Sequence, residues 1–147
     1  MSDAALLPHM LELAAIGPDR LPQDARKMAE LSLFDWMAVS LAGADQPLAH
    51  IIRDFVAAEG GVAKATVTGS KLRLPARAAA LANGTISHAL DYDDTHFAYI
   101  GHPSVAIFPA ALAAAEDIGA SANDVVDAFL IGAESACRIG MVLGRDH

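Results

Sequence analysis

The stretch that decides the fold is LANGTISHALDYDDTHFAYIGHPSVAIFPAALAAAE, residues 81–116. It starts in an alanine-rich segment, passes through a polar loop, and returns to alanine and aliphatic residues after a proline. Alanine has the highest intrinsic helix propensity, and the whole sequence contains 32 alanines. The stretch therefore predicts two helices joined by a polar loop.

Outward from this stretch, proline, glycine and capping residues predict the ends of further helices. We expect six helices, over roughly residues 4–16, 22–41, 47–58, 75–88, 104–118 and 121–143. The segment LSLFDWMAVSLAG, residues 31–43, is apolar on every side, which is typical of a central core helix, and Gly43 is expected as its C-cap. Gly84, inside the fourth helix, suggests close packing against another backbone.

One segment departs from the helical pattern. KATVTGSKLRL, residues 64–74, places Val67 between threonines, which favours extended backbone. No strand partner is evident nearby, so we expect a loop with at most a short strand. The sequence as a whole predicts an all-α helical bundle.

Composition limits the function classes. The 147 residues fit one domain, 54% of them are hydrophobic, and the mean hydropathy is +0.35, so we expect apolar surface for a partner. The formal charge of −8 argues against nucleic-acid binding. The apolar run at residues 105–115 is too short to span a membrane. A single cysteine, Cys137, interpreted as a buried inert thiol, and a first segment without a basic signal region predict a cytoplasmic protein.

The polar loop gathers most of the candidate functional side chains, namely His88, Asp91, Asp93, Asp94, His96 and His102. A metal site, an acid–base site and a solvated loop all fit such a composition. His102 precedes Pro103, which disfavours helical backbone at the histidine and holds it extended where a helix begins. The N–H groups there attract anions, so the imidazole and the helix end could face one acidic ligand.

The spacing inside the loop adds detail. In extended backbone Asp91, Asp93 and Thr95 would point to one side and Asp94 to the other. The same residues also have structural interpretations, because Asp94 or Thr95 can cap a turn and His88 can interact with a helix C-terminus. Their spacing matches neither an EF-hand nor a zinc-protease motif. The spacing therefore disfavours a metal site but leaves it open.

Residues 81–116 closely resemble the signature region of the MmgE/PrpD family, with NG, then H-x-x-D-x-D-D-T, then HPS, in that order. Residues 21–44 and 129–144 are also similar to that family. The resemblance implies a large helical domain, a smaller lid domain that this chain lacks, and a homodimer without an iron–sulfur cluster. On this basis we expect no metal and no cofactor. We expect residues 1–147 to be the N-terminal part of the helical domain.

The resemblance also implies site residues. His102 and Asp91 are expected to be catalytic, with His102 transferring a proton and Asp91 orienting an imidazole or binding a hydroxyl group. Thr95 is expected to donate a hydrogen bond to a substrate carboxylate. Further expected substrate-binding positions are Asp93, Asp94, His88 and Ser104, which match the motif with less defined roles. His96 lies in a variable part of the loop and is a weaker candidate.

The family's enzymes dehydrate, decarboxylate or epimerise small di- and tricarboxylic acids. The expected function is a lyase that dehydrates a 2-methylcitrate-like hydroxy acid by proton abstraction next to a carboxylate. An epimerase, a decarboxylase and a non-catalytic helical dimerisation module are the alternatives. Because family members are much longer, we expect a truncated chain, a subunit or a remnant, and an isolated chain that is inactive or incomplete.

Overall fold

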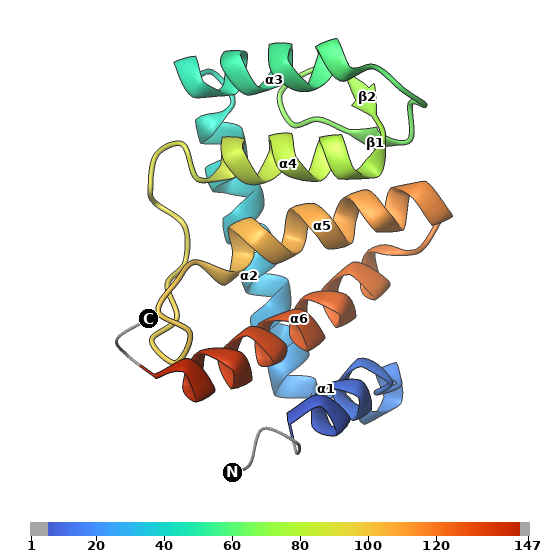
Figure 1. Ribbon diagram of the computed structural model, residues 1–147, viewed down its shortest axis with the longest axis vertical. Helices are drawn as coiled ribbons and strands as arrows, with labels where there is room; N and C mark the ends of the chain where they lie inside the picture. The colour runs from blue at the N-terminus through green and yellow to red at the C-terminus, as the bar shows by residue number, and fades with distance from the viewer. Residues whose placement is uncertain (1–5, 145–147) are drawn as a thin grey trace.

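The computed structural model describes residues 6–144 of the chain. It contains six α-helices in this range, so the all-α prediction is confirmed (Figure 1). The helices are α1 (Leu6–Ala14), α2 (Gln23–Gly43), α3 (Pro47–Glu59), α4 (Ala76–Ser87), α5 (Pro103–Ile118) and α6 (Ala122–Leu143), with a 3-10 turn, η2 (Pro18–Arg20), and two short strands, β1 (Ala65–Thr66) and β2 (Arg73–Leu74). None of these helices has the length and apolarity needed to cross a membrane.

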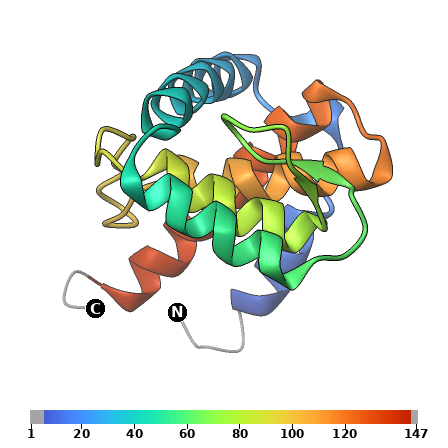
Figure 2. The same cartoon turned by 90° about the horizontal axis from the view of Figure 1, so that it is seen from above.

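The helices form stacked layers. α3 packs on α4, α4 on α5 and α5 on α6, while α2 crosses behind α4, α5 and α6 (Figure 1). The loop that joins α4 to α5, drawn in yellow, lies at one side of this stack in both views (Figures 1 and 2). The loop predicted to carry the functional residues is thus held at both ends by the most closely packed pair of helices.

Two hydrophobic clusters form the core. The first lies between α3, the strands and α4, and includes Val56 and Ile86. The second joins α2, α5 and α6 through a stack of three aromatic rings, with centroid distances of 5.7 Å for Trp36–Phe108 and 3.9 Å for Phe108–Phe129. Burying such rings is among the largest stabilising contributions in a small domain.

The prediction that residues 31–43 are buried on all sides is wrong. Trp36 and Ser40 are buried, but Phe34 is 74% exposed. Leu31, Met37 and Leu41 are exposed as well. α2 therefore covers the stack with one face and leaves a second apolar face open, as the composition suggested for the surface as a whole.

The segment around Val67 does contain paired strands, which corrects the expectation of an unpaired piece. β1 and β2 are antiparallel, with Ala65 opposite Leu74, so the partner comes from the same segment. Gly69, with φ of +68°, provides the left-handed backbone of the connecting turn. Each strand has only two residues, which is too short for a recognisable alternating pattern in the sequence.

Two glycines set the distances between helices. Gly43 is the last residue of α2 and not its C-cap, which is Ala44 with an ordinary φ of −63°. A Cβ atom on Gly43 would collide with the carbonyl oxygen of Ile86 in α4. A Cβ on Gly84 would lie 3.0 Å from the carbonyl oxygen of Val105 in α5, so the close packing expected there is confirmed. α4 is thus held closely between α2 and α5.

The predicted helix ends are mostly within two residues of those observed. The capping box of α6 is present: Ser121 Oγ accepts from the Asp124 N–H (3.3 Å), and Asp124 Oδ2 accepts from the Ser121 N–H (2.8 Å). Pro109 lies inside α5 without delaying its start. The predicted start of the first helix, at residue 4, lies outside the described residues.

Candidate active site

The loop between α4 and α5 begins and ends at a histidine. His88 is the C-cap of α4. His102 is the N-cap of α5, with φ of −105° and ψ of 91°, and Pro103 follows it as the first helical residue. The extended geometry predicted for the residue before proline is therefore present, and it fixes the position of the His102 backbone.

Between these ends the loop turns sharply, which corrects the expected extended alternation. Asp91 has a φ of +55°, and its N–H donates to the carbonyl oxygen of His88 at 3.1 Å. Aspartate is one of the few non-glycine residues that adopts this left-handed backbone at modest cost. The turn brings the chain back over the end of α4, so Asp93 faces the two rings while Asp94 faces α5.

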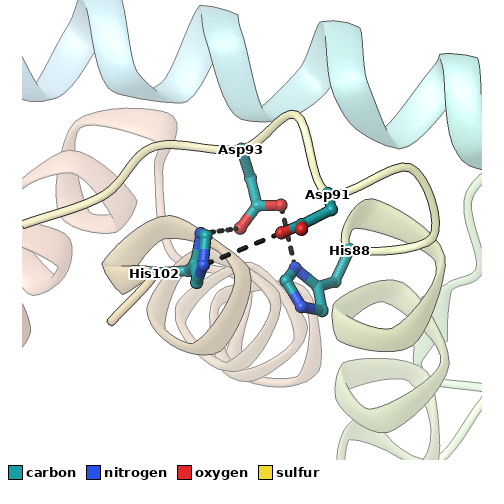
Figure 3. Close-up of side chains that lie close together, drawn as sticks. All are labelled: His88, Asp91, Asp93 and His102. Carbon is teal, nitrogen blue, oxygen red and sulfur yellow. Dashed lines mark hydrogen bonds and ion pairs between the residues drawn. The ribbon is translucent and has the colours of Figure 1, made fainter. Parts of the chain in front are cut away.

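Four of the predicted side chains lie together in a cluster composed of His88, Asp91, Asp93 and His102 (Figure 3). Asp93 is at its centre: Oδ1 lies 2.9 Å from His88 Nδ1, and Oδ2 lies 2.9 Å from His102 Nδ1. The two imidazole rings have a centroid distance of 4.9 Å and are tilted by 58°. A single carboxylate thus contacts both histidines, one with each oxygen.

The two contacts differ in alignment. The His88–Asp93 contact has the geometry of a hydrogen bond. The His102–Asp93 contact lacks that geometry, and neither His102 Nδ1 nor Asp93 Oδ2 has a hydrogen-bond partner within the described residues. The two atoms are therefore within hydrogen-bond distance of each other, shielded from solvent, but not aligned as a hydrogen bond.

The cluster is buried on the Asp93 side and exposed to solvent on the side of His88 and Asp91. The Asp93 side chain is fully buried, whereas those of His88 and Asp91 are 47% and 76% exposed. Asp91 Oδ1 lies 3.8 Å from the other nitrogen of His102, Nε2. The Nε2 edge of His102 therefore lies beside an exposed carboxylate, on a side that a ligand can reach.

Asp94 and Ser104 form a separate pair. Asp94 Oδ1 accepts from the Ser104 N–H (3.1 Å), and Oδ2 accepts from the Ser104 hydroxyl group (2.6 Å). Ser104 is fully buried. Asp94 therefore occupies one of the α5 N–H groups that we expected to face an anionic ligand. This geometry favours an anchoring function for both residues, and their contact with substrate stays a prediction, as does that of Thr95, which is exposed.

The far half of the loop lies on α6, away from the cluster. His96 Nδ1 contacts Cys137 Sγ at 3.3 Å. One turn further along α6, a Cβ on Gly140 would lie 2.7 Å from the carbonyl oxygen of Ala98, so only glycine fits against the loop. Burial, and secondarily the charge of Glu134, raises the pKa of the Cys137 thiol, which disfavours the reactive thiolate. Cys137 is only half-buried, which corrects the expectation of a buried residue, whereas its interpretation as an inert thiol agrees with the raised pKa.

The cluster also has the composition of a metal site. His88, Asp91, Asp93 and His102 each offer a donor atom, and these atoms lie within 4.8 Å of one another. Imidazole and carboxylate donors suit zinc or ferrous iron. The linear spacing did not reveal this convergence, because a turn and a helix start create it. The expectation that no metal is needed stays a prediction.

Cationic side chains form their ion pairs away from the cluster. Within residues 6–144, the Lys and Arg ion pairs are Arg26–Asp127, Lys64–Asp117, Arg77–Glu59 and Arg138–Glu134. A substrate with two or three carboxylates needs positive partners. The cluster supplies groups for proton transfer more readily than it supplies charge for binding.

Comparisons with known proteins agree with the resemblance seen in the sequence. Residues 13–147 match the family model for the MmgE/PrpD N-terminal domain. The chain is 30% identical to the human (Homo sapiens) cis-aconitate decarboxylase over 126 residues, which are 82% of this chain and 25% of the relative. It is 28% identical over 133 residues to the cis-aconitate decarboxylase-like protein oryM of Aspergillus oryzae, covering 86% of this chain and 28% of the relative. The chain thus spans about a quarter of the length of these curated relatives, and it belongs to the MmgE/PrpD family through the N-terminal domain.

Proposed function

We propose that this chain takes part in lyase chemistry on a small di- or tricarboxylic acid, with the cluster moving a proton at a carbon next to a substrate carboxylate. The observation that carries the proposal is the placement of His102. Its backbone is fixed at the start of α5, its Nδ1 contacts a buried carboxylate, and its Nε2 lies on the open side of the cluster.

Each group has a role in this proposal. Histidine is the side chain whose ordinary titration range includes neutral pH, so His102 Nε2 is the candidate to accept or return the proton. Asp91, beside Nε2, stabilises the ring when it is protonated or binds a substrate hydroxyl group. Thr95 donates a hydrogen bond to a carboxylate of the substrate. Positioned acid–base groups of this kind accelerate reactions by about 10²- to 10⁴-fold.

Dehydration of a 2-methylcitrate-like hydroxy acid is the first candidate reaction. Decarboxylation of a cis-aconitate-like acid is the second, and the names of both curated relatives favour it. Identities of 28–30% leave the reaction of this chain open. Both reactions, and an epimerisation, include a proton transfer next to a carboxylate, so the cluster is compatible with each.

The experiment follows that shared proton. The protein encoded by the complete reading frame is incubated in D₂O with 2-methylcitrate or cis-aconitate, and ¹H NMR records deuterium exchange, alkene formation or loss of a carboxyl group. We expect exchange or turnover with at least one acid, and a decrease of about 10²- to 10⁴-fold in His102→Ala. His50→Ala, at an exposed histidine of α3, is the matched control. A wild-type rate in His102→Ala, or no exchange with either acid, would refute the proposal.

A second candidate is a helical dimerisation module, and the exposed face of α2 favours it. Leu31, Phe34, Met37 and Leu41 follow one another at intervals of three or four residues, which places them along one stripe of the helix. We propose that a second copy of the chain covers this stripe. Light scattering should give a dimer mass for the wild type and a monomer mass for Phe34→Glu. A monomer mass for both proteins would exclude the stripe as an interface.

A further inference from the structure

We propose that Asp93 is a positioning residue that holds His88 and His102 in the same tautomer, with the proton on Nδ1 of both rings. The consequence for chemistry, which rests on the proposed function, is that the Nε2 atom of each neutral ring carries a lone pair. The tautomer assignment itself rests on geometry alone.

The geometry restricts the positions of the protons. An ionised carboxylate only accepts hydrogen bonds, and each oxygen of Asp93 lies 2.9 Å from an Nδ1 atom. If either ring carried its proton on Nε2 alone, the lone pair of Nδ1 would face a carboxylate oxygen at that distance. Because Asp93 is fully buried, water cannot relieve such repulsion. Nδ1–H on both rings is the arrangement in which each carboxylate oxygen faces an N–H group and not a lone pair.

The two carboxylates of the cluster then have different functions. Asp93 is buried and contacts the Nδ1 side, so it sets ring orientation and tautomer. Asp91 is exposed and lies 3.8 Å from His102 Nε2, so it cannot fix the ring but can interact with the proton once Nε2 accepts it. The sequence suggested Asp91 as the group that orients an imidazole, and the structure assigns that function to Asp93.

His88 gains a function from the same contact. Of the two rings, His88 forms the hydrogen bond to Asp93, and it is about half exposed. Its Nε2 edge can therefore reach a ligand bound on the exposed side of the cluster. A neutral His88 with Nδ1–H offers an acceptor to a substrate hydroxyl group or carboxylic acid proton. Two Nε2 acceptors, on rings whose centroids lie 4.9 Å apart, would then face one small molecule.

The test reads the tautomers directly. The ¹⁵N-labelled chain is studied by two-bond ¹H–¹⁵N correlation of the imidazole groups at a pH where the rings are neutral, and His88→Gln and His102→Gln spectra assign the signals. We expect the Nδ1–H pattern for both rings in the wild type. The Nε2–H pattern for either ring would overturn the proposal without any further variant.

Asp93→Asn sharpens the test. The amide can accept from one ring but must donate to the other, so exactly one ring is expected to change to Nε2–H. Asp91→Asn and Asp94→Asn are matched controls that should leave both tautomers unchanged. If both rings of a folded Asp93→Asn keep Nδ1–H, the positioning function is refuted. Should that variant not fold, the wild-type spectrum still decides.

Two further readouts separate this proposal from its alternatives. If the chain turns over an acid, Asp93→Asn should lower kcat by about 10- to 100-fold with little change in KM, as for other groups that orient a reactive imidazole. Nδ1–H tautomers in a chain without turnover would leave the positioning function standing and refute only the proposed function. Loss of both Nδ1–H signals with one equivalent of Zn²⁺ would overturn the proposal and make the cluster a metal site.

Discussion

Two buried polar side chains lie close in sequence and behave differently. Asn83, in the middle of α4, accepts from the Thr68 N–H (2.8 Å) and donates to the Thr66 carbonyl oxygen (2.9 Å). Asp93, in the loop after α4, contacts two imidazole rings. Both side chains are nearly or fully inaccessible to solvent. The partners of Asn83 are backbone groups, whereas those of Asp93 are side chains that can gain or lose a proton.

The difference separates a structural polar contact from a candidate site. Asn83 satisfies backbone groups that the short hairpin leaves unpaired, and Glu116 of α5 does the same from another direction by accepting from the Thr66 N–H (2.7 Å). The two partners of the Asn83 side chain are backbone groups, which do not gain or lose a proton. The cluster around Asp93 couples titratable groups and is open to solvent on one side, which is typical of functional sites.

The largest effect on stability is expected at the structural contact. Asn83→Leu removes both hydrogen bonds and leaves two backbone groups poorly paired, so it should lower the free energy of unfolding by about 2–3 kcal/mol. Urea unfolding measures the change. If the comparison holds, the tautomers of His88 and His102 stay as in the wild type, and a changed tautomer would mean that the two polar regions are coupled.

Ser104→Ala should have a smaller effect. It removes the hydroxyl bond to Asp94 but keeps the bond from the Ser104 N–H, so we expect a loss of about 1–2 kcal/mol. Thermal unfolding measures it. The variant also tests whether this pair is structural, like Asn83, or part of the site, like Asp93. If turnover decreases more than the loss of stability explains, Ser104 belongs among the substrate-binding residues.

The smallest effect is expected at the exposed cap of α6. Hydrogen bonds from the Ser121 side chain and backbone lower the pKa of Asp124. A carboxyl group whose pKa is lower in the folded state contributes stability above its unfolded pKa, near 4, and loses it as the pH falls through the folded pKa. Ser121→Ala should therefore lower the free energy of unfolding slightly at pH 7. Urea unfolding should show a smaller difference from the wild type near pH 3, and a difference independent of pH would contradict this origin.

Local signals predicted most of the fold. Pro47 and Pro103 fix the starts of α3 and α5, because proline restricts its own backbone. Ser121 and Asp124 form the N-terminal cap of α6 within four residues. The strand pair and the open face of α2 depend on which surfaces meet, which local propensity does not describe. Phe34 is a good core residue by type, and only the arrangement of the other helices leaves it exposed.

The geometry of the candidate site could be derived from the sequence only in part, because it too depends on which parts of the chain meet. The motif identified the four residues of the cluster, and the spacing from His88 to His102 indicated one loop between two helices. The order of the contacts could not be deduced, because the left-handed backbone of Asp91 redirects the chain and brings Asp93 onto the Nδ1 atoms. The turn at Asp91 thus contributes to which carboxylate contacts which side of the ring.

The contact between the loop and α6 has a practical consequence. Cys137, the single cysteine of the sequence, contacts His96, which lies in the same loop as Asp93. One turn later on α6, Gly140 packs closely against the backbone of that loop. A fluorophore attached to this sulfur would label one position and no other, and its emission would follow the packing of the loop when an acid binds. Because the thiol resists deprotonation, the labelling reaction should be slow and should accelerate when the loop moves away from α6, so its rate is itself a measure of that motion.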